Sequence, residues 1–394
     1  MIRLQATEAQ MGNTKYYVTT MGLGEVARHV KYRETPDDWP PELLTQRKLN
    51  SGRVKKEMVP YLLNNPDHFY GALVVEHVRH GEPTHEVRFK KENDDGSGWI
   101  ELDGTETLEV GDGQHRLSSI KIAVEQRPEL ARERIAVIIL PHRNLKHTQQ
   151  LFSDLNRHAK PTPKSLNILF EHREEEAILA RDVARESRYL SKRVGFTGSN
   201  LSLSSKSPYF VTLSTFYGCT CALADAISAE LTTREERKSF MLHVWDDVVF
   251  PSLPDMALLQ DGRLKPADLR SRYLFATMLG IECLAEAAAA AIQQFPTKWE
   301  LILKQGLSQI KWDLADPAWE GIAISAGRLV VARAPRRRTA TLIKHLLGLM
   351  APEEHVRDLQ TAMWRMGNQD VGAPLPAVDL LPKLQTPLVI PTEL

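Results

Sequence analysis

The side chains best suited to binding or catalysis form one short run of acid, glycine, amide, imidazole and guanidinium: Asp112, Gly113, Gln114, His115 and Arg116. An apolar run ends at Val110 just before it, and an apolar pattern with helical spacing begins at Leu117. The pattern predicts a strand, a glycine turn and a helix. Such a junction aims backbone N–H groups and the positive end of a helix dipole at one point. With His115 and Arg116 added, the run predicts a site for a phosphate group.

The same side chains allow a catalytic alternative. Asp112 and His115 could act as base and acid, and Arg116 as a charge clamp, in the hydrolysis of ATP or another nucleoside triphosphate with Mg²⁺. The sequence has no Walker lysine motif, and Glu109 and Asp154 are candidate further carboxylates for the ion. No cofactor is therefore required by the sequence. A third interpretation is an ordinary solvated turn, because Asp-Gly is a common turn dipeptide.

Basic residues outside this run gather in a few short clusters, which are candidate auxiliary contacts to phosphate. Charge runs are usually solvated faces, so each cluster alone has that alternative explanation. The arginine triplet precedes a predicted helix, where the helix dipole favours acids instead. A bound phosphate or exposure to water would each make that placement tolerable. The clusters are Arg53, Lys55 and Lys56; Arg157, His158 and Lys160 with Lys164; Lys192 and Arg193; and Arg336, Arg337 and Arg338.

Three segments together resemble a known family. The run Asp112–Arg116 spells the DGQHR signature, and residues 152–166 read FSDLNRHAKPTPKSL. A third family-like stretch runs from Gln46 to Leu62 and precedes the apolar segment 69–75. The chain resembles the DGQHR-domain proteins and, more closely, the DndB family associated with DNA sulfur modification. The resemblance covers roughly residues 40 to 170.

The resemblance implies a ParB/sulfiredoxin-like fold whose turn meets a nucleotide or phosphate. It implies that Asn156 and Arg157 face the same ligand as His115 and Arg116. This chain departs from the sulfiredoxin-like pattern, because Gln114 stands where those relatives carry a cysteine. It departs from the ParB-like pattern as well, because its turn is less rich in arginine. Sulfur chemistry and cytidine-nucleotide use at the turn are therefore not expected.

The leading functional hypothesis from the resemblance is a DNA-binding transcriptional repressor of a DNA phosphorothioate modification gene cluster. The turn would hold a phosphate of double-stranded DNA, and Asn156, Arg157 and Lys160 would complete a basic groove. Asp112 would orient His115 or Arg116, or cap the following helix, and Arg116 would grip the phosphate bidentately. The alternatives are a nucleotide-dependent enzyme, an ATPase or a DNA nickase, and a non-catalytic assembly factor for the modification enzymes. A homodimer fits the hypothesis because operators are commonly symmetric.

Composition narrows the class of protein. The chain has 394 residues with 50 basic and 50 acidic side chains, so a uniformly basic nucleic-acid coat protein is excluded while a local basic patch is not. Three cysteines are too few for a disulfide framework and lack zinc-site spacing, and the histidines show no metal-binding motif. We expect a cytoplasmic protein without a signal peptide, membrane helix or metal.

The order of strand and helix patterns predicts an α+β protein. A mixed domain at 1–165, with strands near 72–78, 85–90 and 135–140 and a strand pair 99–102 and 107–110, precedes an all-helical domain at 166–371 and a proline-rich extended tail at 372–394. Helices of the first domain are expected at 49–63, 117–127 and 146–155. Helices of the second are expected at 165–186, 208–230, 233–248, 267–294, 297–309, 317–329, 338–350 and 353–366.

Overall fold

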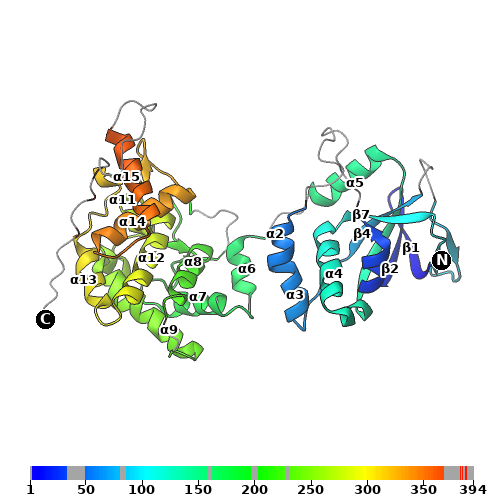
Figure 1. Ribbon diagram of the computed structural model, residues 1–394, viewed down its shortest axis with the longest axis horizontal. Coiled ribbons are helices and arrows are strands. Elements are labelled where there is room, and N and C mark those ends of the chain that lie inside the picture. The colour runs from blue at the N-terminus through cyan, green and yellow to red at the C-terminus, as the bar shows by residue number, and fades with distance from the viewer. Residues whose placement is uncertain are drawn as a thin grey trace. The chain divides into compact units, whose positions relative to one another are not determined.

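The computed structural model describes residues 2–32, 49–79, 86–157, 162–196, 203–227 and 230–367, together with residues 382, 384 and 387. The predicted tail at 372–394 thus lies almost entirely outside the described residues. The chain divides into two compact units, Met1–Lys160 and Pro161–Leu394 (Figure 1). Each unit has its own apolar core.

Within the described residues, the first unit is built on a mixed sheet of eight strands in the order β3-β7-β4-β8-β2-β1-β6-β5. Most neighbours are antiparallel, whereas β3 with β7 and β4 with β8 are parallel. The strands are β1 (Ile2–Met11), β2 (Thr14–Gly22), β3 (Val30–Lys31), β4 (Leu73–Arg79), β5 (Phe89–Lys91), β6 (Ser97–Leu102), β7 (Glu106–Asp112) and β8 (Arg134–Pro141). As the apolar run 135–140 predicts, β8 lies inside the sheet, between β4 and β2.

Alternate residues of the strands are apolar and point to the same face of the sheet, and helices pack on that face. Leu108 and Val110 of β7 are buried in the same core as Leu117, Ile120 and Ala123 of the following helix. The helical segments of the first unit are α1 (Leu23–His29), α2 (Ser51–Arg53), η2 (Val54–Met58), α3 (Val59–Asn64), α4 (Gln114–Gln126), η3 (Pro128–Arg132) and α5 (Leu145–Arg157). The predicted helices 49–63, 117–127 and 146–155 are confirmed, and the first contains one π-helical turn, η2.

Two strand predictions for the first unit need correction. The segments 99–102 and 107–110 are strands, but they do not pair with each other. β6 pairs with β1 and β5, whereas β7 pairs with β3 and β4. The turn after β6 is held by Asp103, whose carboxylate accepts from the backbone and the hydroxyl of Thr105. A local turn signal was thus present, but pairing with the distant β1 decides the place of β6. The strand expected at 85–90 begins only at Phe89.

The second unit is mainly helical around the long, buried helix α12 (Met278–Gln294). Its other helices are α6 (Lys164–Phe170), α7 (Glu175–Glu186), α8 (Leu213–Ala224), α9 (Arg234–Leu242), η4 (His243–Val249), η5 (Phe250–Ser252), α10 (Met256–Gln260), α11 (Pro266–Arg272), η6 (Leu274–Ala276), α13 (Trp299–Gln309), η7 (Pro317–Trp319), α14 (Arg333–Leu346) and α15 (Glu353–Gly367). The expectation of an all-helical second domain is wrong in detail. Two short sheets pair β9 (Val194–Gly195) with β10 (Val211–Thr212) and β11 (Ile324–Ser325) with β12 (Arg328–Leu329).

Several predicted helices of the second unit are broken. The segment 165–186 forms α6 and α7, and Arg181 donates to the carbonyl of Leu169 near the end of α6. The segment 267–294 breaks before α12, where the Thr277 hydroxyl caps the new helix by accepting from the Gly280 N–H. The segment 317–329 is helical only in η7, because Ala326 and Gly327 have positive φ and turn β11 back on β12. Such backbone conformations end a helix.

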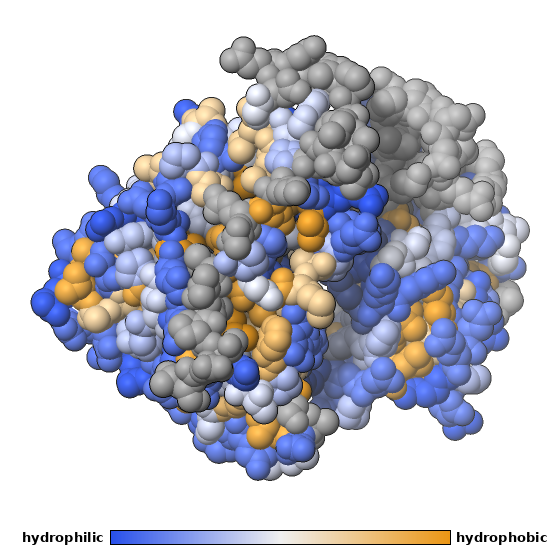
Figure 2. Space-filling view, turned by 60° about the vertical axis from the view of Figure 1, so that its left-hand side comes forward, coloured by the Kyte–Doolittle hydropathy of each residue, from blue (hydrophilic) through white to orange (hydrophobic). Residues whose placement is uncertain are grey.

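The surface in Figure 2 is mostly hydrophilic, with hydrophobic residues interspersed. Among the helices in the described part of the chain, none combines the length and the apolar composition needed to cross a membrane.

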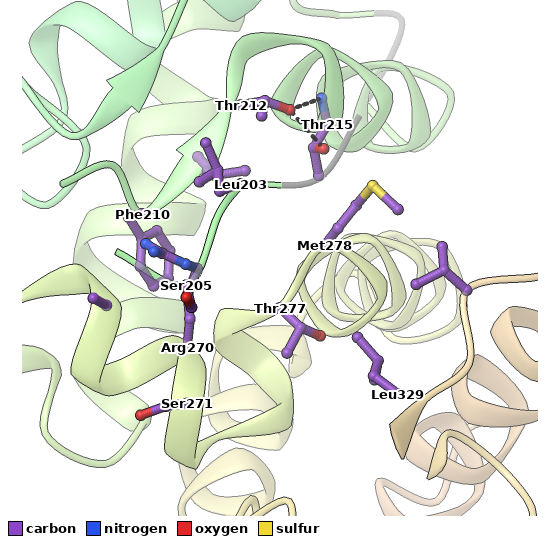
Figure 3. Close-up of a pocket in the computed structure, with 13 residues that line it drawn as sticks. Leu203, Ser205, Phe210, Thr212, Thr215, Arg270, Ser271, Thr277, Met278 and Leu329 are labelled. Carbon is purple, nitrogen blue, oxygen red and sulfur yellow. Dashed lines mark hydrogen bonds between the residues drawn. The ribbon is translucent and has the colours of Figure 1, made fainter. Parts of the chain in front are cut away.

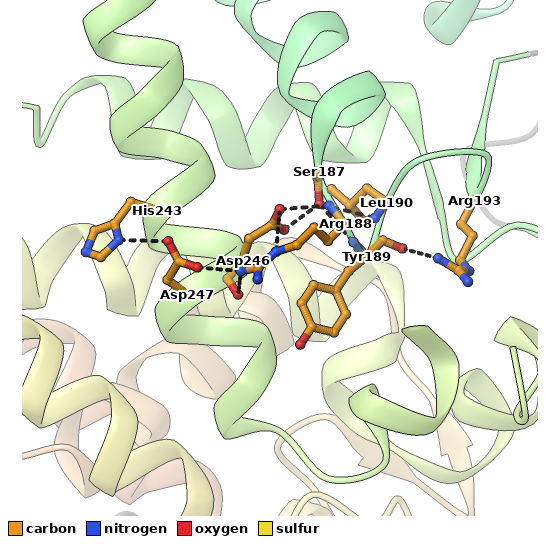
Figure 4. Close-up of polar contacts among 8 residues, drawn as sticks. All are labelled: Ser187, Arg188, Tyr189, Leu190, Arg193, His243, Asp246 and Asp247. Carbon is orange, nitrogen blue, oxygen red and sulfur yellow. Dashed lines mark hydrogen bonds and ion pairs between the residues drawn. The ribbon is translucent and has the colours of Figure 1, made fainter. Parts of the chain in front are cut away.

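Within the second unit, buried polar contacts fasten η4 to the end of α7 (Figure 4). Asp246 is buried and accepts from the Ser187 hydroxyl at 2.6 Å and the Arg188 N–H at 2.7 Å. Burial raises the pKa of this carboxyl group, although these hydrogen bonds oppose the shift.

The neighbouring His243 should make the second unit pH-sensitive. Burial lowers the pKa of His243, but hydrogen bonds to Glu300 and Asp247 outweigh that effect and raise it above 6.5. Because its pKa is higher in the folded protein than in the unfolded chain, protonated His243 stabilises the fold. This stabilisation is complete at pH values below the unfolded pKa and is lost as the pH rises through the folded pKa. We expect amide hydrogen exchange in peptides covering α9, η4 and α13 to quicken from pH 6 to pH 8.5, after correction for intrinsic exchange. In His243→Gln the pH trend should flatten, and an unchanged trend would contradict this assignment.

Candidate phosphate-binding site

The DGQHR run lies where β7 ends and α4 begins, as the sequence predicts. Asp112 is the last residue of β7, Gly113 adopts a left-handed conformation with φ of 99°, and Gln114 begins α4. A Cβ atom at Gly113 would lie 2.6 Å from Leu73 Cδ2 and 3.0 Å from Arg116 Nε. Glycine is therefore required at this position by both the backbone conformation and the space.

Arg116 is held by the protein itself. Its Nη1 donates to the carbonyls of Gly71 and Ala72 at 2.8 Å each, and its Nη2 donates to Asp112 Oδ2 at 2.6 Å. The side chain is only 23% exposed. Asp112 contacts the Arg116 guanidinium, as one of the three roles considered for this acid requires. It does not cap α4, whose N-cap is Gly113 without a side-chain hydrogen bond. The guanidinium thus fastens the strand–helix junction to the segment that leads into β4.

His115 connects the turn to a second helix. Its Nε2 accepts a hydrogen bond of 3.0 Å from the backbone N–H of Asn50. Asn50 is the N-cap of the helical segment α2–η2–α3, since its side chain accepts from the Arg53 N–H at 3.0 Å. Burial, together with the charge of Arg53, lowers the pKa of His115. The imidazole is therefore neutral near pH 7, and its proton lies on Nδ1.

The two helices run parallel, with their N-termini side by side. Asn50 contacts His115 at the beginning of both helices. At the other end, Arg127, which follows α4, donates to the carbonyls of Leu63 at 2.6 Å and Leu62 at 3.1 Å near the end of α3. Two helix dipoles therefore present their positive ends at the same edge of the sheet. The sequence shows neither this pairing nor the roles of Asn50 and Arg127.

The basic cluster at 53–56 lies on this second helix. Arg53 is exposed and forms an ion pair of 3.4 Å with Glu57. Asn50 bonds both to His115 and to the backbone N–H of Arg53, so the structure brings these two predicted residues together. Lys55 and Lys56 are exposed on the π-helical turn η2, which packs against α4. The predicted residues of the first unit that meet at the junction are thus Asp112, Gly113, Gln114, His115, Arg116 and Arg53.

Two tyrosines, Tyr61 and Tyr70, pack beside the junction and connect its elements. The Tyr70 hydroxyl lies 3.1 Å from Ser119 Oγ of α4 and donates to the carbonyl of Met58 in η2. Burial raises the pKa of Tyr70. The Tyr70 ring stacks on Tyr61 with ring centroids 5.7 Å apart. These contacts hold α4, η2 and the segment before β4 as one body.

The other predicted contacts have separate outcomes. Asn156 and Arg157 lie in the last turn of α5, whereas His158 and Lys160 lie outside the described residues. Lys164 begins α6 of the second unit, where its ammonium group lies 5.9 Å from the centroid of the Tyr217 ring. The grouping of these residues with the turn stays a prediction.

The arginine triplet differs from expectation. Arg336, Arg337 and Arg338 lie inside α14 and do not precede it, because the helix begins at Arg333 and a proline is tolerated in its first turn. All three are paired with acids of the second unit. Arg336 binds Glu282 and Glu286 at 2.9 Å, and the other two share Asp358 at 2.8 and 2.9 Å. These ion pairs explain how the helix accommodates three adjacent arginines.

A buried carboxylate near the junction is not apparent from the sequence. Glu76 of β4 is 2% exposed and accepts from the Thr148 hydroxyl of α5 at 2.8 Å, and His142 Nδ1 lies 3.3 Å from it. Glu76 pairs in register with Glu109 of β7, which the sequence offered as a carboxylate for Mg²⁺. In the described part of the chain, no group of three His, Cys, Asp or Glu side chains is arranged to hold a metal ion.

The second unit contains a partly open cavity of about 300 Å³ between the beginnings of α8 and α12 (Figure 3). Its wall is mainly apolar, with Phe210 and Met278 among the lining residues. The hydroxyls of Thr212 and Thr277 cap the two helices, and Arg270 donates to the carbonyls of Ser204, Ser207 and Tyr209. These polar groups therefore maintain the fold, and the junction of the first unit remains the better candidate site.

The fold and the site define a two-unit protein whose N-terminal mixed sheet carries a DGQHR strand–glycine–helix junction. The chain belongs to the DndB family, described as DNA-sulfur modification-associated, whose family model matches residues 4–350. The match covers most of both units. Comparison with curated proteins gives no match, and comparison with solved structures gives none.

Proposed function

We propose that this protein is a DNA-binding transcriptional repressor of a DNA phosphorothioate modification gene cluster, and that a DNA phosphate is held at the DGQHR junction. The family association with DNA sulfur modification supports the biological setting. The observation that carries the proposal is the parallel pair of helices whose N-termini meet at His115 and Asn50. Backbone N–H groups and dipoles at helix N-termini bind phosphate without any enzymatic chemistry.

The charged groups around the junction are better arranged to bind a polyanion than to act as acid and base in catalysis. Asp112, the acid of the turn, is occupied by Arg116, and His115 is already an acceptor for Asn50. Arg53, Lys55 and Lys56 add exposed positive charge along the second helix. Exposed cations that neutralise backbone phosphates give salt-dependent affinity for DNA. We therefore assign Arg116 to positioning and Arg53 with the first turn of α4 to phosphate contact.

We further propose that the first unit is the DGQHR domain and that its fold is ParB/sulfiredoxin-like. The mixed sheet with a glycine between β7 and α4 supports this assignment. Double-stranded DNA is the proposed partner, and a homodimer would match a symmetric operator. Asn156, Arg157, His158, Lys160 and Lys164 remain proposed contacts to the same DNA.

The test is fluorescence anisotropy of the full chain with DNA from upstream of its own gene cluster and with a scrambled duplex, at two salt concentrations. Tight and sequence-selective binding is expected. Equal affinity for both duplexes would overturn the repressor proposal. Phosphate release from ATP that requires Mg²⁺ and survives rigorous purification would favour the nucleotide-dependent enzyme instead.

Replacing Arg53 should weaken DNA binding without unfolding the protein. Arg53→Gln removes one exposed charge beside His115, so we expect the dissociation constant for DNA to rise about three- to tenfold. The slope of log affinity against log salt concentration should fall by the amount that corresponds to about one phosphate contact. Lys90→Gln is the matched control, because Lys90 is exposed on β5, an edge strand at the other end of the sheet. An equal loss in both variants would show that the effect is general charge and not the junction.

A further inference from the structure

The second unit contains a cavity of about 410 Å³ that lies against α14, α12 and the beginning of α15. Residues 333, 336, 337, 340, 341 and 344 line it, and their spacing places them on one face of α14. Four of these six are arginine or lysine, and His355 adds a fifth basic side chain from α15. Glu286 is the acid among the lining residues.

Positive charge exceeds negative charge around this cavity. The carboxylates of Glu282, Glu286 and Asp358 are taken up by Arg336, Arg337 and Arg338. Within the described residues, the side chains of Arg333 and Lys344 have neither a hydrogen bond nor an ion pair. Two cations that face one cavity without acids of their own favour the entry of an anion.

Arg337 adds to this excess. Its Nη2 binds Asp358 at 2.8 Å, but its Nε–H is buried without an acceptor among the described residues. A guanidinium that is only partly satisfied and partly desolvated attracts negative charge more strongly than one in water. Arg336 and Arg337 of the arginine triplet therefore have a local role that differs from direct exposure to DNA, since both line this positively charged cavity.

We propose that this cavity is a second anion site, which binds a phosphate-bearing ligand through Arg333 and Lys344. The volume suits more than a single phosphate, since small-molecule sites occupy about 300–1,000 Å³. Guanidinium and ammonium groups are the usual partners of phosphate oxygens. The phosphate can belong to a free polyphosphate or nucleotide, or to the DNA backbone, and the DNA source alone rests on the proposed function.

The experiment measures binding of tripolyphosphate, ATP and duplex DNA to the full chain at physiological salt. Calorimetry follows the small ligands, and anisotropy follows DNA. Arg333→Gln and Lys344→Gln should each raise the dissociation constant of at least one of these ligands about three- to tenfold. The matched control is Lys298→Gln, which removes an exposed lysine of the same unit that does not line the cavity.

The three arms separate the sources. Weakened binding of tripolyphosphate or ATP with unchanged DNA affinity identifies a free ligand, whereas weakened DNA binding alone identifies the phosphodiester backbone. Binding of a small phosphate that depends on Lys344, in a protein that does not bind DNA, would leave this inference standing and remove the proposed function. No binding of any of the three, or equal binding by the wild type and both cavity variants, would overturn the inference.

Discussion

Replacing Gly113 with alanine should destabilise the first unit and abolish DNA binding. A non-glycine residue held at φ of 99° costs about 1–3 kcal/mol of unfolding free energy. The new methyl group would also meet Leu73 Cδ2 at 2.6 Å and push against the Arg116 guanidinium. Chemical denaturation, together with hydrogen exchange in β7 and α4, measures the loss of stability. Fluorescence anisotropy measures the loss of DNA binding.

Gly111→Ala is the control for this prediction. Gly111 lies two residues earlier, outside the left-handed region, and a Cβ atom there would make an ordinary contact of 3.5 Å with the carbonyl of Val74. We expect this variant to keep its stability and its DNA affinity. If Gly111→Ala and Gly113→Ala behaved alike, the special geometry assigned to the junction would be wrong.

Replacing Arg116 should be costly for stability, and lysine should not rescue it. Arg116→Ala removes three charge-assisted hydrogen bonds from a side chain that is 23% exposed, so we expect a loss of about 1.5–3 kcal/mol. A lysine keeps the charge but cannot span Gly71, Ala72 and Asp112 with a planar fork. Arg116→Lys should therefore unfold at nearly the same denaturant concentration as Arg116→Ala.

The lysine variant separates positioning from direct contact. A residue that only contacts phosphate would tolerate lysine, with stability unchanged and most DNA affinity retained. A positioning residue loses stability in both variants. A double-mutant cycle with Asp112→Asn should show coupling between the two side chains, since their atoms lie 2.6 Å apart. Simple additivity of the two substitutions would contradict the ion pair as a stabilising contact.

Local signals in the sequence predict the junction well. Alternating apolar residues up to Val110, a glycine at 113 and helical spacing from Leu117 are all properties of neighbouring residues, and the structure confirms the strand and helix they predict. The fate of Arg116 is different. Its acceptors, Gly71 and Ala72, are about 45 residues away, and backbone carbonyls leave no trace in a sequence pattern.

Long-range pairing also explains the errors in the fold. The pattern around Asp103 resembles a hairpin, but β1 offers β6 a longer partner, with six residues in register from Ile2 to Thr7. The predicted helix 317–329 fails for a local reason that the apolar spacing conceals, since positive φ at Ala326 and Gly327 reverses the chain. Arg336–Arg338 appear free in the sequence because their acids lie on other helices.

The two parallel helices have a thermodynamic consequence. Contacts at Asn50–His115 and at Arg127–Leu63 join them at both ends, and Tyr70 joins them in between. The backbone at the two helix N-termini and the side chains of His115 and Arg116 are thus held by contacts within the protein itself. Association with a phosphate should therefore involve little further ordering of the chain, so binding at this site is preorganised and its entropic penalty is small. Rapid association with little structural change in the first unit is the behaviour that such a rigid receptor should show.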